Sequence, residues 1–135
     1  MRQHEQALLY LNKAVEDEVL LDEVLASPRV SDTVIGFHCQ QAAEKLLKAL
    51  LSNLMVRFRR THDLRELMDL LTDNGHAIPE ALADLDILTP YAVEFRYEFL
   101  PQEQETPLDR QEARELVQRL RTWVESKIGS QLGDH

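Results

Sequence analysis

The sequence has few of the residues that form disulfides, bind metal ions or anchor a protein in a bilayer. Cys39 is the single cysteine in 135 residues, which excludes an internal disulfide, and no Cys and His spacing typical of a zinc site occurs. No apolar run approaches the ~18 residues of a membrane span, and the N-terminal residues lack the apolar core of a signal peptide. We therefore expect no metal, no cofactor and no membrane contact, and a cytoplasmic location.

Glycine and proline are also scarce, with four and five residues, and neither strand-like alternation nor an internal repeat is present. Hydrophobic residues make up 44% of the chain. At this length that is enough to form a buried core without disulfides or a bound metal. These features predict one helical domain over residues 1–135, with its core in 3–128 and a tail over 129–135.

Positive charge is in short supply as well. The chain has 15 Lys and Arg against 24 Asp and Glu, a formal net charge of −9, which makes nucleic-acid binding over the surface as a whole unfavourable. The one basic cluster is Arg57, Arg59 and Arg60, with Phe58 among them. This cluster is either a solvated loop or a contact for a phosphate or an acidic partner, and both interpretations remain open.

Apolar residues recur with helical spacing in long stretches. The first stretch, residues 3–26, is apolar on two nearly opposite faces, which indicates a helix that is sandwiched or that serves both a core and a subunit interface. Pro28 breaks it, and Ser31 or Asp32 then caps a second helix that continues to about residue 55.

Three further helical stretches follow. A cap at Thr61 or Asp63, with Glu66 reaching back as a capping box, predicts a third helix that ends at residues 74–75. A fourth helix is predicted from residue 79, restarted or kinked near residue 89, and a last one runs from residue 107 to 128. The expected fold is an all-α, up-and-down bundle of four long helices plus a short fifth helix.

Residues 35–54 form the stretch around which the chain is organised. Apolar side chains fill an arc of roughly 200° on a helical wheel, wider than a surface helix needs, so this helix is predicted to be central. One polar stripe remains on it, and we expect that stripe to stay open to a ligand. Its members are His38, Gln41, Lys45, Lys48 and Ser52.

The same stretch follows the pattern H-x-Q-Q-A-x-E-K-x-L-K-A from His38 to Ala49, and Thr61-His62-Asp63-Leu64 comes after it. With Tyr91 and the pair Arg96-Tyr97 downstream, the chain resembles the HEPN family of small helical domains over residues 7–126. The first block carries most of the resemblance.

The resemblance implies two alternative functions. The ribonuclease branch of the family carries an Arg followed four to six residues later by a His, and the pair acts across a dimer. Here Arg96 is followed by no His before His135, so a general acid or base of near-neutral pKa is missing. We therefore expect no catalytic residue and no enzyme activity.

The other branch accompanies small nucleotidyltransferases without catalysing a reaction, and this is the function that the resemblance favours. It implies a homodimer, formed through the first or the last helix, that binds a nucleotide or nucleotide-like substrate or docks a separate minimal nucleotidyltransferase. In this interpretation Arg96 and the lysines bind phosphate, and the tyrosines stack a base or bond a ribose. The candidate ligand-binding residues are Arg96, Tyr97, Tyr91, His38, Gln41, Lys45, Lys48 and His62.

Each candidate also has a purely structural interpretation. Glu44 and Lys48 are four residues apart in the order that favours a salt bridge on one helix. His38 and His62 are placed to hydrogen-bond neighbouring segments, and Arg96 to pair with a carboxylate. The competing functions are an RNase toxin of a toxin-antitoxin pair, with a degenerate site, and a structural adaptor.

Overall fold

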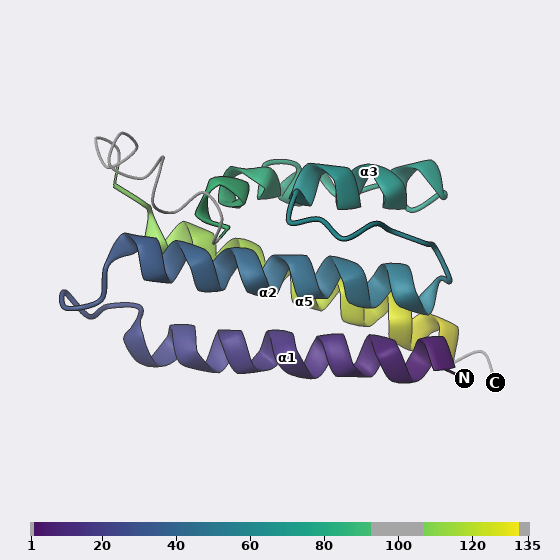
Figure 1. The fold of residues 1–135 in the computed structure, drawn as a ribbon, viewed down its shortest axis with the longest axis horizontal. Helices are drawn as coiled ribbons and strands as arrows, with labels where there is room; N and C mark the ends of the chain where they lie inside the picture. The colour runs from purple at the N-terminus through teal and green to yellow at the C-terminus, as the bar shows by residue number, and fades with distance from the viewer. Residues whose placement is uncertain (1, 93–106, 133–135) are drawn as a thin grey trace.

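The computed structural model describes residues 2–92 and 107–132, with the backbone alone for 130–132. The described residues are helical and include no strand, so the predicted all-α class is confirmed. The elements are α1 (Arg2–Val24), α2 (Asp32–Asn53), α3 (Leu64–Asp73), the 3-10 helices η1 (Glu80–Leu82) and η2 (Leu85–Tyr91), and α5 (Arg110–Leu132) (Figure 1).

Helix α2 is the central element of the bundle. It contacts α1, α5, α3 and η2, and Figure 1 shows α1 lying along one side of it while α3 and the green 3-10 segments lie along the other. The start of α1 and the end of α5 lie at the same end of the bundle (Figure 1). The prediction of a helix buried among several neighbours is therefore confirmed.

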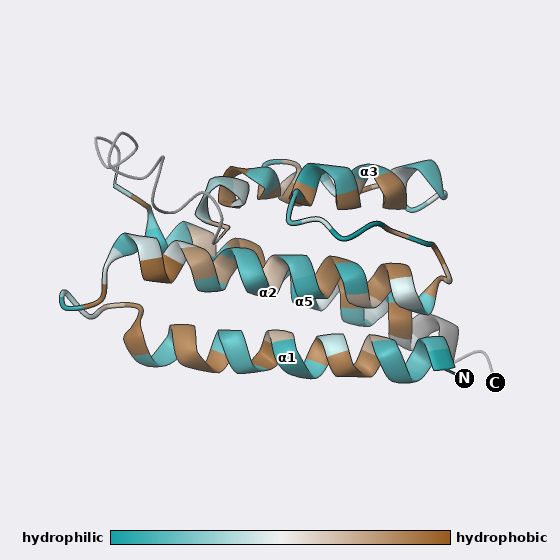
Figure 2. Ribbon diagram, viewed as in Figure 1, coloured by the Kyte–Doolittle hydropathy of each residue, from teal (hydrophilic) through white to brown (hydrophobic). Residues whose placement is uncertain are grey.

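The core is built mostly from leucine and alanine on the inner faces of these helices. Figure 2 shows brown, apolar turns recurring along α1, α2 and α3, interrupted by teal, polar ones. The predicted apolar arc is fully buried on α2, and only its last member, Leu54 at the C-cap, is partly buried. The residues with no exposed surface are Ile35, Cys39, Ala42, Ala43, Leu46, Leu47, Ala49 and Leu50.

Helix ends follow the local signals in the sequence. The side chain of Ser31 accepts a hydrogen bond from the backbone of Val34, and Asp63 caps α3. Asn74 is the C-cap of α3, followed by Gly75 at φ +89°, a conformation that glycine adopts without strain. The predicted capping box is wrong, because the Glu66 carboxylate instead takes two hydrogen bonds from Arg59, at 2.7 and 2.8 Å.

The predicted bounds need correction in the second half of the chain. The fourth helix begins as η1 and η2 and not as an α-helix, with Pro90 inside η2, because a proline ring removes a backbone donor and disturbs the preceding α-helical turn. Helix α5 begins at Arg110, after Asp109 accepts from the Glu112 backbone, and it runs through Gly129. The predicted continuation over 93–99 lies outside the described residues.

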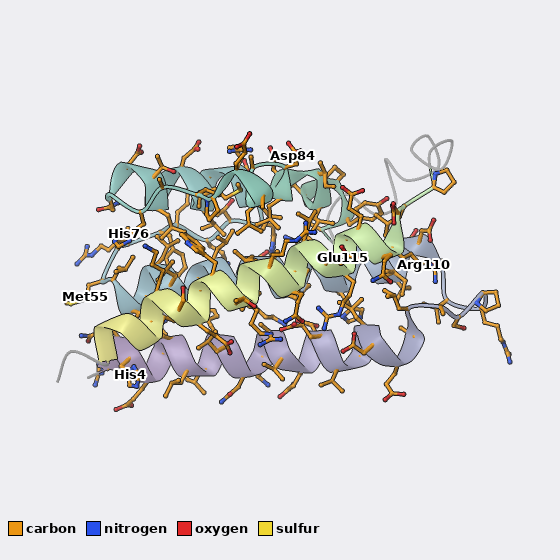
Figure 3. All side chains as sticks on the ribbon, turned by 180° about the vertical axis from the view of Figure 1, so that it is seen from behind. His4, Met55, His76, Asp84, Arg110 and Glu115 are labelled. Carbon is orange, nitrogen blue, oxygen red and sulfur yellow. The ribbon has the colours of Figure 1, made fainter. Side chains whose placement is uncertain are left out.

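Arg110 fastens the start of α5 to the connection between α1 and α2 at one end of the bundle (Figure 3). Its Nε donates to Asp32 at 2.7 Å, and its two terminal nitrogens donate to the carbonyls of Leu25, Ser27 and Val30. Five donors in a planar fork suit this arrangement, which a lysine could not reproduce.

Farther along α5, arginines pair with carboxylates of α1. Arg114 lies 2.7 Å from Asp22, and both Arg114 and Arg121 reach the buried Glu18, at 3.2 and 3.0 Å.

None of the described helices combines the length and apolarity that a bilayer crossing requires.

Candidate functional site

The first half of the polar stripe meets a carboxylate from the neighbouring helix. Asp17 of α1 is 8% exposed and lies 3.0 Å from His38 Nδ1 and 2.7 Å from Lys45 Nζ, both on α2. Because one carboxylate has two oxygens, it takes one partner on each. The imidazole and the ammonium of the stripe are thus held against their own chain.

The second half of the stripe is closed by Glu44. Its Oε2 accepts from Lys48 Nζ at 2.8 Å, and its Oε1 lies 2.8 Å from His62 Nδ1 and 2.9 Å from Gln40 Nε2. Gln40 also donates to the backbone carbonyl of His62 at 3.1 Å. His62 directly precedes the Asp63 cap of α3, so this cluster locks the start of α3 onto α2.

Charge pairing controls the ionisation of Glu44. Burial alone would raise the pKa of its carboxyl group, but the hydrogen bonds from Lys48, Gln40 and His62 outweigh burial, and the pKa lies below its ordinary value. Glu44 therefore stays ionised at neutral pH and neutralises the cation beside it.

The stripe does not stay open along its whole length as predicted: Lys48 is closed off, whereas His38 and Lys45 are paired but partly exposed. The side chain of Lys48 is 10% exposed, and those of His38 and Lys45 are 24% and 27% exposed. The salt bridge between Glu44 and Lys48, the structural alternative drawn from their spacing, is confirmed.

The remaining candidates do not complete a binding site among the described residues. Gln41 donates to the side chain of Gln40 at 2.7 Å. Tyr91, at the end of η2, packs so closely over Gly36 that a Cβ there would overlap its ring. Arg96 and Tyr97 lie outside the described residues, and their role stays a prediction.

A hollow of about 230 Å³ lies beside Tyr91, between η2 and the start of α5. Two carboxylates, Asp109 and Glu112, are among the residues that line it. Their charge makes this hollow unfavourable for a phosphate.

A model of the HEPN domain family matches residues 30–127. The chain belongs to the HEPN domain family. No curated protein and no solved structure matches the chain. The family confirms the resemblance drawn from the sequence and associates this chain with a nucleotide-related or RNase-like function.

The two sequence blocks that suggested the HEPN family meet in space. The first block, His38 to Ala49, lies on α2, and the second, residues 61–64, leads into α3. The contacts of Gln40 and Glu44 with His62 join the two blocks. In this HEPN domain, much of the recognisable pattern therefore holds two helices together.

Asp17 is the residue that the sequence analysis missed. It lies within the buried row Ala7, Ala14 and Leu21 of α1, three residues after Ala14 and four before Leu21. The sequence signal for it was an acidic residue at a position that the helical spacing places on the buried, apolar face of α1. Such a carboxylate needs a cationic partner on the helix that it faces.

Cys39 is a small, fully buried residue on the apolar face of α2. Burial raises the pKa of its thiol to about 12, so it stays protonated and is no nucleophile at neutral pH.

No group of three His, Cys, Asp or Glu side chains that could hold a metal ion occurs among the described residues.

Proposed function

We propose that the protein is a non-catalytic HEPN-type accessory protein that acts as a homodimer and docks a separately encoded minimal nucleotidyltransferase. The observation that carries this proposal is the internal use of the stripe, in which Asp17 pairs with His38 and Lys45 while Glu44 pairs with Lys48. Groups already neutralised in this way have little left to offer a phosphate. Docking of a protein is thus favoured over nucleotide binding along α2.

The outer face of α1 supports the dimer. Leu8, Val15 and Val19 are 42%, 41% and 58% exposed, and with the partly buried Leu11 they form a strip at steps of three and four residues. That spacing lets one helix pack along another. The inner face of α1 is used by the core, so its second apolar face is left for a second copy of the chain.

Helix α5 is the weaker alternative for the dimer. Its apolar residues Leu116, Val117, Leu120 and Val124 are buried in the monomer. Its exposed positions are polar and include Gln118, Arg119, Thr122 and Glu125.

Light scattering after size-exclusion chromatography tests the dimer. We expect a dimer for the unaltered chain and a monomer for Val15→Asp, because a charge in the strip would be buried without a partner. Val34→Asp is the matched control, since Val34 is 40% exposed on α2, and it should remain dimeric. A monomeric parent protein, or equal dissociation of both variants, would refute the α1 interface.

Docking is tested by titrating the protein with a minimal nucleotidyltransferase encoded beside it. A complex of fixed stoichiometry supports the accessory function. Absence of a complex with that transferase, measured at micromolar concentrations, argues against it.

One observation favours an RNase-like function as the second candidate. Asp17 holds His38 Nδ1, the arrangement by which a carboxylate orients an imidazole for proton transfer, and His38 Nε2 has no hydrogen bond to a described residue. Incubation with RNA separates the candidates. Inert RNA supports the accessory function, whereas cleavage that disappears in His38→Asn supports the RNase.

A further inference from the structure

A groove of about 530 Å³ lies at the end of the bundle where α1 begins and α2 ends. Its walls come from the first turns of α1 and from the connection that follows α2, and Figure 3 labels Met55, from that connection, at this end. A second hollow, of about 240 Å³, continues along α1, because Gln6 and Tyr10 line both. Leu9 and Lys13 complete its lining. The groove and the hollow together form an elongated surface that follows α1.

The length of this surface suits a segment of polypeptide. From Arg2 to Lys13 the lining runs along about 16 Å of helix, which is the length of about five residues of an extended chain. A peptide can lie along such a surface and contact both of its ends, whereas a compact molecule fills one end only.

Two guanidinium groups at the wide end of this surface are available to a partner. Arg2 and Arg57 are exposed, and neither forms an ion pair or hydrogen bond with a residue that the structure describes. Lys13, at the other end, in contrast lies 3.9 Å from Glu16. No carboxylate is among the described residues that line the groove or the hollow. In a chain of net charge −9, this end is a local site for carboxylates of a partner.

Exposed apolar side chains lie beside these cations. Leu9 is 64% exposed and Met55 is 72% exposed, and the rings of Tyr10 and Phe58 lie 6.5 Å apart at 59°. Lys48 Nζ lies 5.8 Å from the Phe58 centroid, which helps to hold that ring in place. Such a surface suits an apolar side chain of a partner, and a flexible methionine adapts to its shape.

The backbone of Met55 gives an independent indication. Met55 follows the C-cap of α2 with φ +61°, where a helix usually has glycine and where any other residue adds strain. Because most of its side chain is exposed, packing within the chain does not explain this conformation. Unfavourable backbone conformations of this kind gather at binding sites.

We propose that this groove docks an acidic peptide segment of a partner protein, in which an apolar side chain is flanked by carboxylates. Arg2 and Arg57 bind the carboxylates, because the planar fork of a guanidinium group matches two carboxylate oxygens. The apolar side chain packs against Leu9, Tyr10 and Met55, where its burial contributes the hydrophobic part of the affinity. Apolar anchors held between polar contacts are typical of peptide docking.

Single-stranded nucleic acid suits this surface less well. It carries a phosphate at every nucleotide, and here it would meet two unpaired guanidinium groups in an acidic chain. The side chains of Leu9 and Met55 have no strong donor or acceptor for the edge of a base, whereas both can contact an aliphatic side chain. The observations therefore favour a peptide.

The groove is separate from the strip of α1 proposed for the dimer. Steps of 100° per residue place Gln6, Leu9 and Lys13 on the side of α1 roughly opposite to that strip. A dimer formed through the strip therefore leaves the groove open. The proposal holds for any protein that carries such a segment, so it goes beyond docking of a transferase and can fail without it.

Fluorescence anisotropy of a labelled synthetic peptide tests the proposal with the full-length protein. The probe has two central leucines with glutamates on both sides. We expect saturable binding of this probe that weakens as salt is added. A peptide with glutamine in place of glutamate, and one with serine in place of leucine, should each bind at least about tenfold more weakly.

Two pairs of variants place the binding in the groove. Arg57→Gln should raise the Kd of the probe about tenfold, as expected for loss of a charged hydrogen bond, and Leu9→Ser should raise it about fivefold. The matched controls are Arg60→Gln, in the same connection outside the groove, and Leu20→Ser, at a 40% exposed position farther along α1. Both controls should leave Kd unchanged within about twofold.

The proposal is overturned if the probe shows no saturable binding at millimolar concentration or if the two members of a matched pair weaken it equally. Displacement of the probe by an equimolar single-stranded RNA would also overturn it, in favour of a nucleic-acid site. Light scattering should show that Leu9→Ser and Arg57→Gln remain dimeric. Loss of peptide binding with the dimer retained therefore assigns the effect to the groove and not to the α1 interface.

Discussion

The polar stripe of α2 and the groove at the end of the bundle carry similar side chains in opposite states. In the stripe, Lys45 and Lys48 each lie within 2.8 Å of a carboxylate oxygen. The groove lies where α1 begins and α2 ends and has a volume of about 530 Å³. In it, Arg2 and Arg57 have no carboxylate beside them among the described lining residues. The comparison shows that the availability of a cation depends on whether a carboxylate lies beside it and not on residue type; a neighbouring helix supplies that carboxylate for Lys45, and the same helix supplies it for Lys48.

The two regions also differ in what they do for the fold. The stripe and the adjacent Glu44 join three helices, since Asp17 of α1 pairs with His38 and Lys45, and His62, which leads into α3, pairs with Glu44. The guanidinium groups of Arg2 and Arg57 in the groove join none of the helices that the structure describes. We therefore expect substitutions in the stripe to lower the free energy of unfolding and substitutions in the groove to leave it nearly unchanged.

Glu44→Gln should have the largest effect, a loss of about 3 kcal/mol in the free energy of unfolding at neutral pH, because it leaves Lys48 buried without its counterion. Urea unfolding measures the change at fixed protein concentration. Glu66→Gln, which breaks the exposed pair with Arg59, is the control and should cost less than about 1 kcal/mol.

The same variant should alter the response to acid. Since the pKa of Glu44 is lowered in the folded state, its contribution to stability is present above its ordinary pKa of 4.5 and is lost as the pH falls and the carboxylate is protonated. The parent protein should therefore lose more stability than Glu44→Gln between about pH 6 and pH 3. Parallel losses in the two proteins would show that Glu44 is not a source of the pH dependence.

Asp17→Asn should have an intermediate effect, about 2 kcal/mol, because it weakens two charged hydrogen bonds whose donors are partly exposed and can turn to water. Glu16→Gln, one residue earlier and 3.9 Å from Lys13 on the surface, should change stability by less than about 0.5 kcal/mol. Equal effects would mean that Asp17 does not join α1 to α2 as described.

Met55→Gly should stabilise the protein by about 0.5 to 1 kcal/mol, because glycine relieves the φ +61° backbone by more than it costs in chain entropy. Thermal unfolding measures this gain. A lower unfolding temperature would indicate instead that the methionine side chain is packed for stability.

Arg57→Gln should have the smallest effect on folding, within about 0.5 kcal/mol, because no described residue pairs with Arg57. Lys48→Gln is the opposite case and should cost about 2 kcal/mol, since it removes the partner of a buried carboxylate. If urea unfolding ranks these two variants equally, the contrast between the closed stripe and the open groove fails.

Features that depend on neighbours along the chain were predictable from the sequence. The caps at Ser31 and Asp63, the end of α3 at Asn74, the burial of Cys39 and the Glu44 pair with Lys48 all involve residues within four positions or one helical face. Helical spacing and capping chemistry act at that range, so the all-α class followed from them. The same signals failed at residues 80–91, where two 3-10 helices formed around proline.

The sequence by itself determined which side chains share a face of α2, and therefore that a polar stripe exists. Spacing on one helix also accounts for the pairing of Lys48 with Glu44. Only the tertiary structure decided that Asp17 closes the other half of the stripe and that His62 holds Glu44, because these two residues are 21 and 18 residues away from the partners they meet, His38 and Glu44. The packing of α1 and α3 against α2 sets those distances, and no local pattern encodes them. The same packing left the guanidinium groups of Arg2 and Arg57 at one end of the bundle, where no carboxylate of a described residue holds them.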